Sequence, residues 1–403
     1  DWLLRKMRRP APGAFLSLRD LRHEFEPDVV VSAGPFAPMA GGARAVGAEP
    51  LWVDVPGDPM SEAQLRAFRS GSHDPIHRYR QVLSLAVTRG DQFSVVSDSQ
   101  RPVLIGALGL AGRLTAREMG REMVHVIPPS LEGLHRDCIP ETPQGLLTGV
   151  APEDFTVLIC GGYNTWMDEE TLVAGVLRAM DSDPHVHLAS TGGGLAGHSE
   201  GSYQRFRRLA ERSKHAARFH FLGWVPTRHL DAVYGAADLA VNMDLPCYEA
   251  EFGSRTRLLD AMERGLPAAS TVTCDLTRQM SEVEGFFPLD GGDAPMLAAL
   301  LIRLAGEKRR RLVSGGAGVT DELAAVGNLR QVPWSFVRKQ YTVTNSTRAL
   351  LEWVQDPVTT HEDLEVDFIE DQWAEIARLQ ERLEEVWRSP TWRYLGRVHK
   401  MLK

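Results

Sequence analysis

The chain has 403 residues, of which 43% are hydrophobic and 24% charged, the balance of an ordinary globular protein. At roughly 100–200 residues per domain, this length predicts two or three domains. The net charge of −8 provides no overall basic field, so we expect no nucleic-acid partner. We find no run of about 18 apolar residues and therefore expect no membrane-spanning segment.

Short runs rich in β-branched residues open the chain and alternate with helical patterns. Four predicted strands are Asp28–Ser32, Leu51–Val55, Phe93–Ser97 and Val124–Ile127. Amphipathic stretches at Glu62–Arg69 and Ile76–Arg89 lie between them. This alternation predicts an α/β domain with a parallel sheet over residues 1–145. Four strands are few for a doubly wound domain, and the chain opens at Asp1, so we expect a piece to be missing before it.

A break in the pattern falls at Pro128–Pro152, where prolines and glycines gather. Such composition is typical of an interdomain linker. A second α/β domain is then expected over residues 151–340, followed by C-terminal helices over 345–403 that either cross back or face a membrane. Its predicted strands are Thr156–Cys160, Val186–Ser190, Arg218–Leu222, Leu239–Asn242 and Pro267–Thr271.

The cysteines suggest reduced thiols rather than a metal site. Their spacing matches no zinc motif and contains no C-x-x-C pair. We expect a cytoplasmic protein without a site metal. The four residues are Cys138, Cys160, Cys247 and Cys274.

The most informative segment is YEAEFGSRTRLLDAMERGLP, residues Tyr248–Pro267. Glycines at both ends predict a helix over Ser254–Arg264, whose apolar stripe packs on the sheet. Arg255 shares the side of this stripe at the first turn, where an arginine needs an anionic partner. A helix N-terminus also favours an anion. The pattern therefore predicts either a diphosphate site or a structural ion pair of Arg255 with Glu249 or Glu251.

This segment resembles the donor-site signature of GT-B glycosyltransferases. The residues that carry the resemblance are Glu249, Arg255, Thr256, Arg257, Asp260 and Gly265–Pro267. The family motif has two glutamates eight residues apart, whereas Glu251 and Asp260 are nine apart and Glu249 and Asp260 eleven. The resemblance implies two Rossmann-like doubly wound domains with a C-terminal helical extension. It covers roughly residues 28–290.

The resemblance also implies roles for these residues in sugar transfer. Arg255 and Arg257 would bind the donor diphosphate, and Glu249 or Glu251 would face the donor sugar as catalytic residues with Arg255. Asp260 would hold the ribose. Alternatively, Asp260 pairs on a solvated face with Arg257 or with the arginine four residues later, Arg264.

Two upstream segments fit the same family. In Phe221–Asn242, backbone groups at Trp224 and Val225 would read the nucleotide base, unless Trp224 is a core residue. In the loop Gly161–Asp168, the residues Gly161, Gly162 and Asn164 would lie near the donor phosphates, and Asp168 can cap the following helix. The glycine-rich run Ser190–Gly197 is interpreted as a flexible loop.

The first domain contributes weaker candidates. Asp54 and Asp58 lie at and beyond the carboxyl end of the predicted strand Leu51–Val55, hence near the cleft. Asp54 would orient the acceptor or the donor, or cap a loop. Arg113 is a further candidate partner for a phosphate.

The implied function is transfer of a sugar from a nucleotide-diphosphate donor to a glycan or lipid-linked acceptor in polysaccharide or glycoconjugate biosynthesis. The resemblance implies retention of configuration, and arginines in place of a metal predict a metal-independent reaction with no cofactor beyond the nucleotide sugar. Two alternatives stay open: a sugar-nucleotide epimerase and a non-catalytic GT-B-shaped scaffold.

The C-terminal segment 388–403 combines basic residues with interleaved apolar ones. Such an end can lie on an anionic membrane surface, or it can form a helix docked on the first domain. The sequence thus predicts a cytoplasmic enzyme for which peripheral membrane contact is one of two alternatives.

Overall fold

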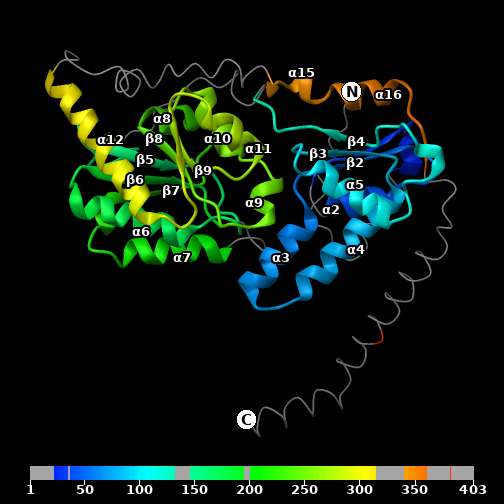
Figure 1. Ribbon diagram of the computed structural model, residues 1–403, viewed down its shortest axis with the longest axis horizontal. Helices are drawn as coiled ribbons and strands as arrows, with labels where there is room; N and C mark the ends of the chain where they lie inside the picture. The colour runs from blue at the N-terminus through cyan, green and yellow to red at the C-terminus, as the bar shows by residue number, and fades with distance from the viewer. Residues whose placement is uncertain are drawn as a thin grey trace, which may run out of the picture. The chain divides into compact units, whose positions relative to one another are not determined.

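The computed structural model describes residues 22–34, 37–131, 146–194, 200–314 and 340–360, together with Arg382 (Figure 1). Residues 1–359 form one compact unit, and 360–403 form a second. All the labelled helices and strands belong to the first unit. Within the described residues, no helix combines the length and apolar character needed to cross a bilayer.

The first sheet has four parallel strands in the order β1-β2-β3-β4. These strands are β1 (Val30–Ser32), β2 (Leu51–Val55), β3 (Gln92–Val95) and β4 (Val124–Val126). The helices between them are α2 (Ala37–Ala45), α3 (Pro59–Ser70), α4 (Asp74–Arg89) and α5 (Arg101–Leu110), with the short η1 (Ala116–Glu118) before β4. β2 is buried at four of its five residues, as expected for a strand covered on both faces.

The second sheet has six parallel strands in the order β10-β9-β8-β5-β6-β7. They are β5 (Phe155–Ile159), β6 (Val186–Thr191), β7 (Phe219–Gly223), β8 (Leu239–Asn242), β9 (Ala268–Thr271) and β10 (Phe286–Leu289). The chain runs outward from β5 to β7 and then returns to β8 on the other side of β5. The carboxyl ends of β5 and β8 therefore mark the switch point where doubly wound sheets bind ligands.

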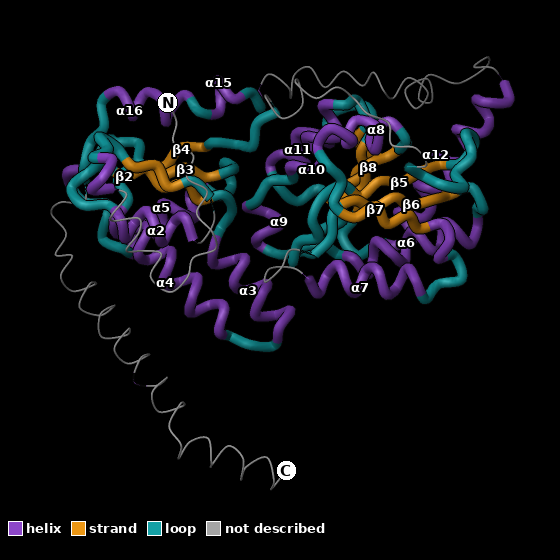
Figure 2. The backbone as a smooth tube through the Cα atoms, turned by 180° about the vertical axis from the view of Figure 1, so that it is seen from behind, coloured by secondary structure: helices purple, strands orange, loops and turns teal. Residues whose placement is uncertain are grey.

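Helices cover both faces of the second sheet, as Figure 2 shows. One buried cluster lies under α6 (Glu169–Ser182), α7 (Glu200–Glu211) and α12 (Ala294–Ser314), and the other under α8 (Leu230–Gly235), α10 (Thr256–Glu263) and α11 (Asp275–Ser281). α6 and α12 approach closely because Gly175 has no side chain; a Cβ there would lie 2.7 Å from Leu297. The α/β fold with two parallel sheets is as the sequence predicted.

The predicted strands agree with the structure to within two residues at each end. The sequence did not predict β10, the long helix α12, or the short helix α9 (Tyr248–Phe252). The predicted helix Ser254–Arg264 begins at Thr256, and Arg255 is its N-cap. Short 3-10 turns at η2 (Ala216–Arg218) and η3 (Thr227–His229) flank β7.

After the second sheet the chain returns to the first. The Leu131 amide donates to the Tyr341 carbonyl over 2.7 Å, and α15 (Val343–Ser346) and α16 (Arg348–Gln355) follow. Trp353 of α16 is buried, and its ring centroid lies 5.5 Å from that of Trp52 in β2. The predicted C-terminal helices beyond residue 360, including the basic segment 388–403, lie outside the described residues.

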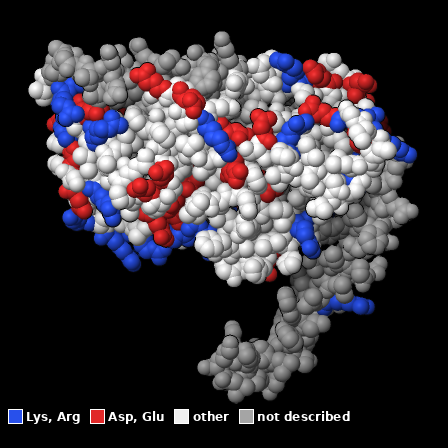
Figure 3. Space-filling model, in the orientation of Figure 1, with Lys and Arg blue, Asp and Glu red and all other residues white. Residues whose placement is uncertain are grey.

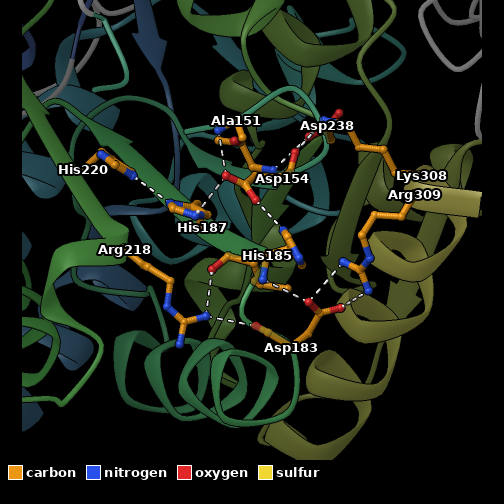
Figure 4. Close-up of polar contacts among 12 residues, drawn as sticks. Ala151, Asp154, Asp183, His185, His187, Arg218, His220, Asp238, Lys308 and Arg309 are labelled. Atoms are coloured by element: carbon orange, nitrogen blue, oxygen red, sulfur yellow. Dashed lines mark hydrogen bonds and ion pairs between the residues drawn. The ribbon is translucent and has the colours of Figure 1, made fainter. Parts of the chain in front are cut away.

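A network of histidines and carboxylates joins the amino ends of β5, β6 and β7 (Figure 4). Asp154 accepts from His185 Nδ1 over 2.7 Å and lies 3.5 Å from His187 Nε2. His187 in turn bonds His220 at 3.0 Å, with the two rings stacked. This network lies at the edge of the sheet opposite the switch point.

Candidate functional site

A pocket of about 520 Å³ opens at the carboxyl ends of the second sheet. Of the residues that the resemblance assigned to the donor site, all except Glu251 line it: Gly161, Gly162, Asn164, Trp224, Val225, Glu249, Arg255, Arg257 and Asp260. The loops after β5 and β7 and the start of α10 thus converge on one cavity. Residues after β2 and β3 complete the lining, namely Pro56, Gly57 and Val96.

The two candidate glutamates lie on the short helix α9 but face different ways. Glu249 is 5% exposed and lines the pocket, whereas Glu251 is exposed and does not. Residues two apart on a helix point about 200° apart, so only one can face the cavity. The structure therefore favours Glu249 for any contact with a ligand.

Arg255 is almost fully buried, and its partner is neither Glu249 nor Glu251. Its Nε donates to Asp244 Oδ2 over 2.5 Å, and its guanidinium lies over the ring of Trp166. Both alternative ion pairs expected from the sequence are therefore wrong. Burial lowers the pKa of Arg255, but the Asp244 carboxylate and further negative neighbours together raise it by more, so the arginine stays charged. Its charge at the pocket is already largely neutralised.

Arg257 is the second arginine of the pocket, and among the described residues it pairs with no carboxylate. Its Nη2 donates to the Gly162 carbonyl over 2.6 Å, while its buried Nη1 has no hydrogen-bond partner in that part of the chain. Burial lowers the pKa of Arg257, as expected where a cation lacks a counter-charge. A buried, unsatisfied donor at a pocket is costly, and an anionic ligand would satisfy it.

Glycines bring two loops into contact at the floor of the pocket. Gly161 and Gly192 both have positive φ, +98° and +73°. A Cβ on Gly192 would lie 2.2 Å from the Gly161 carbonyl oxygen, so no side chain fits there. The sequence predicted only a flexible loop over Ser190–Gly197. The glycine directly after a strand was the signal for this close approach.

Trp224 is 63% exposed, so the alternative that placed it in the core is wrong. Its indole and the neighbouring Val225 line the same cavity as the arginines. An exposed aromatic ring at a pocket can stack on a planar ligand.

Asp260 both lines the pocket and lies near Arg264, the two positions that the sequence allowed. Its Oδ1 lies 3.8 Å from Arg264 Nη1, as expected for the surface pair, and the residue also lines the pocket. The alternative pair with Arg257 does not form, since that guanidinium bonds Gly162 instead. That Asp260 holds the ribose of the donor stays a prediction.

The candidates from the first domain have structural contacts. Asp58 caps α3 by accepting from the Ser61 amide, and Asp54 accepts from Ser94. Asp168 likewise caps α6, as predicted. Arg113 does not lie at the pocket: its Nη1 donates to the carbonyls of Val87, Thr88 and Gly90, which corrects its assignment as a phosphate partner.

A second cavity of about 570 Å³ lies between α3 and α4 and shares Pro56 and Gly57 with the first. Its walls combine apolar and charged side chains: Met39, Pro59, Glu62, Arg66, Asp74, Arg78, Tyr79 and Val82. The sequence did not predict this cavity, because its residues come from helix faces that carry no motif.

The chain has one Asp-x-Asp sequence, Asp181–Asp183, at the end of α6. Asp181 pairs with Lys214, and Asp183 pairs with Arg309. Neither aspartate lines the pocket.

Comparisons with known proteins bear on the fold and on the second sheet domain. Residues 154–307 match the model of the family described as glycosyl transferases group 1. The chain therefore has the GT-B fold, and the matched region lies in its second sheet domain. None of the curated proteins matches it.

Solved GT-B structures share the fold across most of the chain. HepE from Anabaena, solved with UDP and glucose, is 16% identical with a TM-score of 0.57, covering 87% of this chain and 84% of its own. Sucrose-phosphate synthase from Thermosynechococcus elongatus is 17% identical with a TM-score of 0.56, over 85% and 78%. TarM from S. aureus, solved with UDP, is 10% identical with a TM-score of 0.55, and only 58% of its length is covered.

Proposed function

We propose that this glycosyltransferase takes a sugar from a UDP-linked donor bound in the pocket below α10 and passes it to a glycan or lipid-linked acceptor. The observation that carries the proposal is the gathering of Arg257, Arg255, Trp224 and Glu249 around one cavity at the switch point. UDP is the nucleotide solved in the similar structures HepE and TarM, which supports it as the donor nucleotide here.

Arg257 is the residue we assign to the diphosphate. Its Nη1 is buried with no partner among the described residues, whereas the charge of Arg255 is balanced by Asp244. A phosphate oxygen beside that donor would restore a charge-assisted hydrogen bond, worth about 1.5–3 kcal/mol. The start of α10 then adds positive potential at the same place.

The leaving diphosphate can be stabilised by these fixed charges alone. On this ground we propose a metal-independent reaction with no cofactor besides the nucleotide sugar. Retention of configuration is proposed from the family resemblance. Glu249 lines the pocket and is the group we assign to the donor sugar.

The acceptor is assigned to the second cavity, because Pro56 and Gly57 line both this cavity and the donor pocket. Its walls offer Tyr79 and Met39 to a sugar face, and Arg66 and Arg78 to an anionic group. A glycan or a lipid-linked sugar both fit this chemistry. We further propose a cytoplasmic reaction in polysaccharide or glycoconjugate biosynthesis, with the segment 388–403 resting on the membrane surface.

Calorimetric titration of the full chain with UDP, GDP, dTDP and ADP tests the donor assignment. We expect UDP to bind best, and addition of a chelator to leave binding and transfer unchanged. Binding of none of the four by the folded protein would instead favour the scaffold alternative. Turnover of the UDP-sugar without acceptor, giving an epimeric sugar nucleotide, would favour the epimerase.

A further inference from the structure

The buried carboxyl group of Glu249 at the pocket contacts a serine of helix α3, next to the first sheet. Glu249 Oε2 lies 2.9 Å from Ser61 Oγ of α3. The same Ser61 Oγ lies 2.9 Å from the carbonyl oxygen of Asp58. Both contacts have hydrogen-bond length, yet a serine hydroxyl has a single proton to donate.

Counting protons decides between two states of this group. If Glu249 is ionised, Ser61 donates to only one of two acceptors, and the other contact places two oxygen lone pairs against each other. If Glu249 carries a proton, it donates to Ser61 Oγ, and Ser61 donates to the Asp58 carbonyl. The protonated state therefore makes one hydrogen bond more, with the same atoms in the same places.

The surroundings of the carboxyl group act in the same direction. Burial is the main cause that raises the pKa of Glu249 to about 8; the negative charges of Glu62 and Asp58 add to it, and Arg255 and the Ser61 hydrogen bond oppose it. Arg255 is the strongest opposing influence on Glu249, but its guanidinium pairs with Asp244 and makes no ion pair with Glu249. The titratable or charged groups around Glu249 are Asp58, Glu62, Asp244, Cys247 and Arg255.

Resting on the proposed function, we propose that Glu249 is a neutral carboxylic acid in the free enzyme, with its proton donated to Ser61. Ser61 is then a positioning residue: it holds the acid against the pocket from α3. A neutral group beside the arginines adds no negative charge where a diphosphate binds. Its second oxygen, which Gly57 approaches closely, stays available as an acceptor for a sugar hydroxyl.

Infrared difference spectroscopy tests the proton directly. The spectrum of the wild type minus that of Glu249→Gln should show a protonated-carboxyl C=O band at about pH 7, which disappears as pH rises past about 8. Glu251→Gln is the matched control, because that residue is exposed on the same helix. A difference spectrum at pH 7 that shows only carboxylate bands overturns the proposal.

UDP-glucose binding tests the consequence. Since the pKa is raised, the neutral form is lost as pH rises, so affinity should fall at least about threefold between about pH 7 and pH 9. Glu249→Gln should abolish this pH dependence. An unchanged pH profile in that variant contradicts the proposal.

The role of Ser61 has its own readout. Ser61→Ala should shift the carboxyl band and move the pH midpoint of UDP-glucose binding, and Ser61→Thr should restore both. If the pH midpoint of UDP-glucose binding were the same in Ser61→Ala as in the wild type, Ser61 would have no positioning role. If UDP-glucose binds at no pH, the proposed function is wrong, while the infrared band still determines the state of Glu249.

Discussion

At the scale of single residues, the two arginines of the pocket differ in what they are already bonded to. Arg255 sits against a buried carboxylate eleven residues earlier in the chain, while Arg257 bonds a backbone carbonyl. The sequence placed both at the start of a helix but could not show which was neutralised. Asp244 follows β8 in a turn with no motif of its own, so its pairing is visible only in three dimensions.

This difference predicts opposite outcomes for two substitutions. Arg257→Ala should lower UDP affinity at least about tenfold with little loss of stability, because it removes one charge-assisted donor. Arg255→Ala should cost about 3–5 kcal/mol of stability, because it leaves the Asp244 carboxylate buried and unpaired. Titration calorimetry and urea unfolding measure the two effects. Arg278→Ala, an exposed arginine outside the pocket, is the control.

If Arg257→Ala bound UDP as tightly as the wild type, the diphosphate would have to lie elsewhere. Equal stability losses for the two arginine variants would contradict the assigned difference in pairing.

Two glycines with the same backbone angle provide a matched pair for testing the pocket floor. Gly192 and Gly112 both have φ of +73°. A Cβ on Gly192 meets the Gly161 carbonyl, whereas a Cβ on Gly112 meets nothing within 4 Å. Gly192→Ala should therefore lower the unfolding free energy by clearly more than Gly112→Ala and should also weaken UDP binding. Similar melting temperatures for the two variants would show that the loops are free to separate.

At the scale of elements, the strands were the most predictable part of the chain. Short buried apolar runs such as Leu51–Val55 and Leu239–Asn242 are consistent with strands of a parallel sheet, and their short length favours strand over helix. β10 was missed because Phe286–Leu289 is short and contains a proline. α9 was missed because five residues are too few to show a helical repeat of apolar side chains. This short helix nevertheless determines which of the two glutamates faces the pocket.

The histidine network at the amino ends of β5–β7 predicts acid-sensitive stability (Figure 4). Burial lowers the pKa of His187 and of His220, so the folded state holds them neutral. Below about pH 6.5 the unfolded chain binds protons that the folded chain does not. The contribution of these histidines to stability is therefore full above about pH 6.5 and is lost progressively as pH drops below it.

Urea unfolding between about pH 7.5 and pH 5 measures this slope. His220→Phe keeps a ring for stacking on His187 but cannot titrate, so its stability should fall less over the same range. The exposed His73, changed to Gln, is the control and should follow the wild type. If the unfolding free energy of His220→Phe fell with pH as steeply as that of the wild type, the histidine network would not be the cause of the acid sensitivity.

At the scale of the whole molecule, the sequence predicted two sheets joined by a proline-rich connection, and the family resemblance implied the GT-B fold correctly. Through Asp54 and Asp58 it pointed to the loop after Leu51–Val55, but it could not predict that Pro56 and Gly57 of that loop, rather than the aspartates, line the pocket. Charge offered little guidance at this scale. On the face drawn in Figure 3, acidic and basic side chains of the described residues are interspersed.

The return of the chain to the first sheet provides a test at this scale. Trp353 of α16 is 8% exposed and lies against Trp52 of β2. Trp353→Ala should cost about 3–5 kcal/mol, since removal of a large aromatic side chain leaves a cavity. Leu351→Ala, on the same helix but 56% exposed, should cost far less. Thermal unfolding compares the two, and equal melting temperatures would mean that α16 does not support the sheet.

The contact of Trp353 with Trp52 also constrains how this protein can be divided. A fragment cut at the proline-rich connection would lack α16 and so would expose a tryptophan surface on β2 that the intact chain covers. Expression of the amino-terminal half alone should accordingly give an aggregation-prone product. Supplying residues 340–360 on a tether, or permuting the chain so that they precede β1, is the rational way to obtain that half for study.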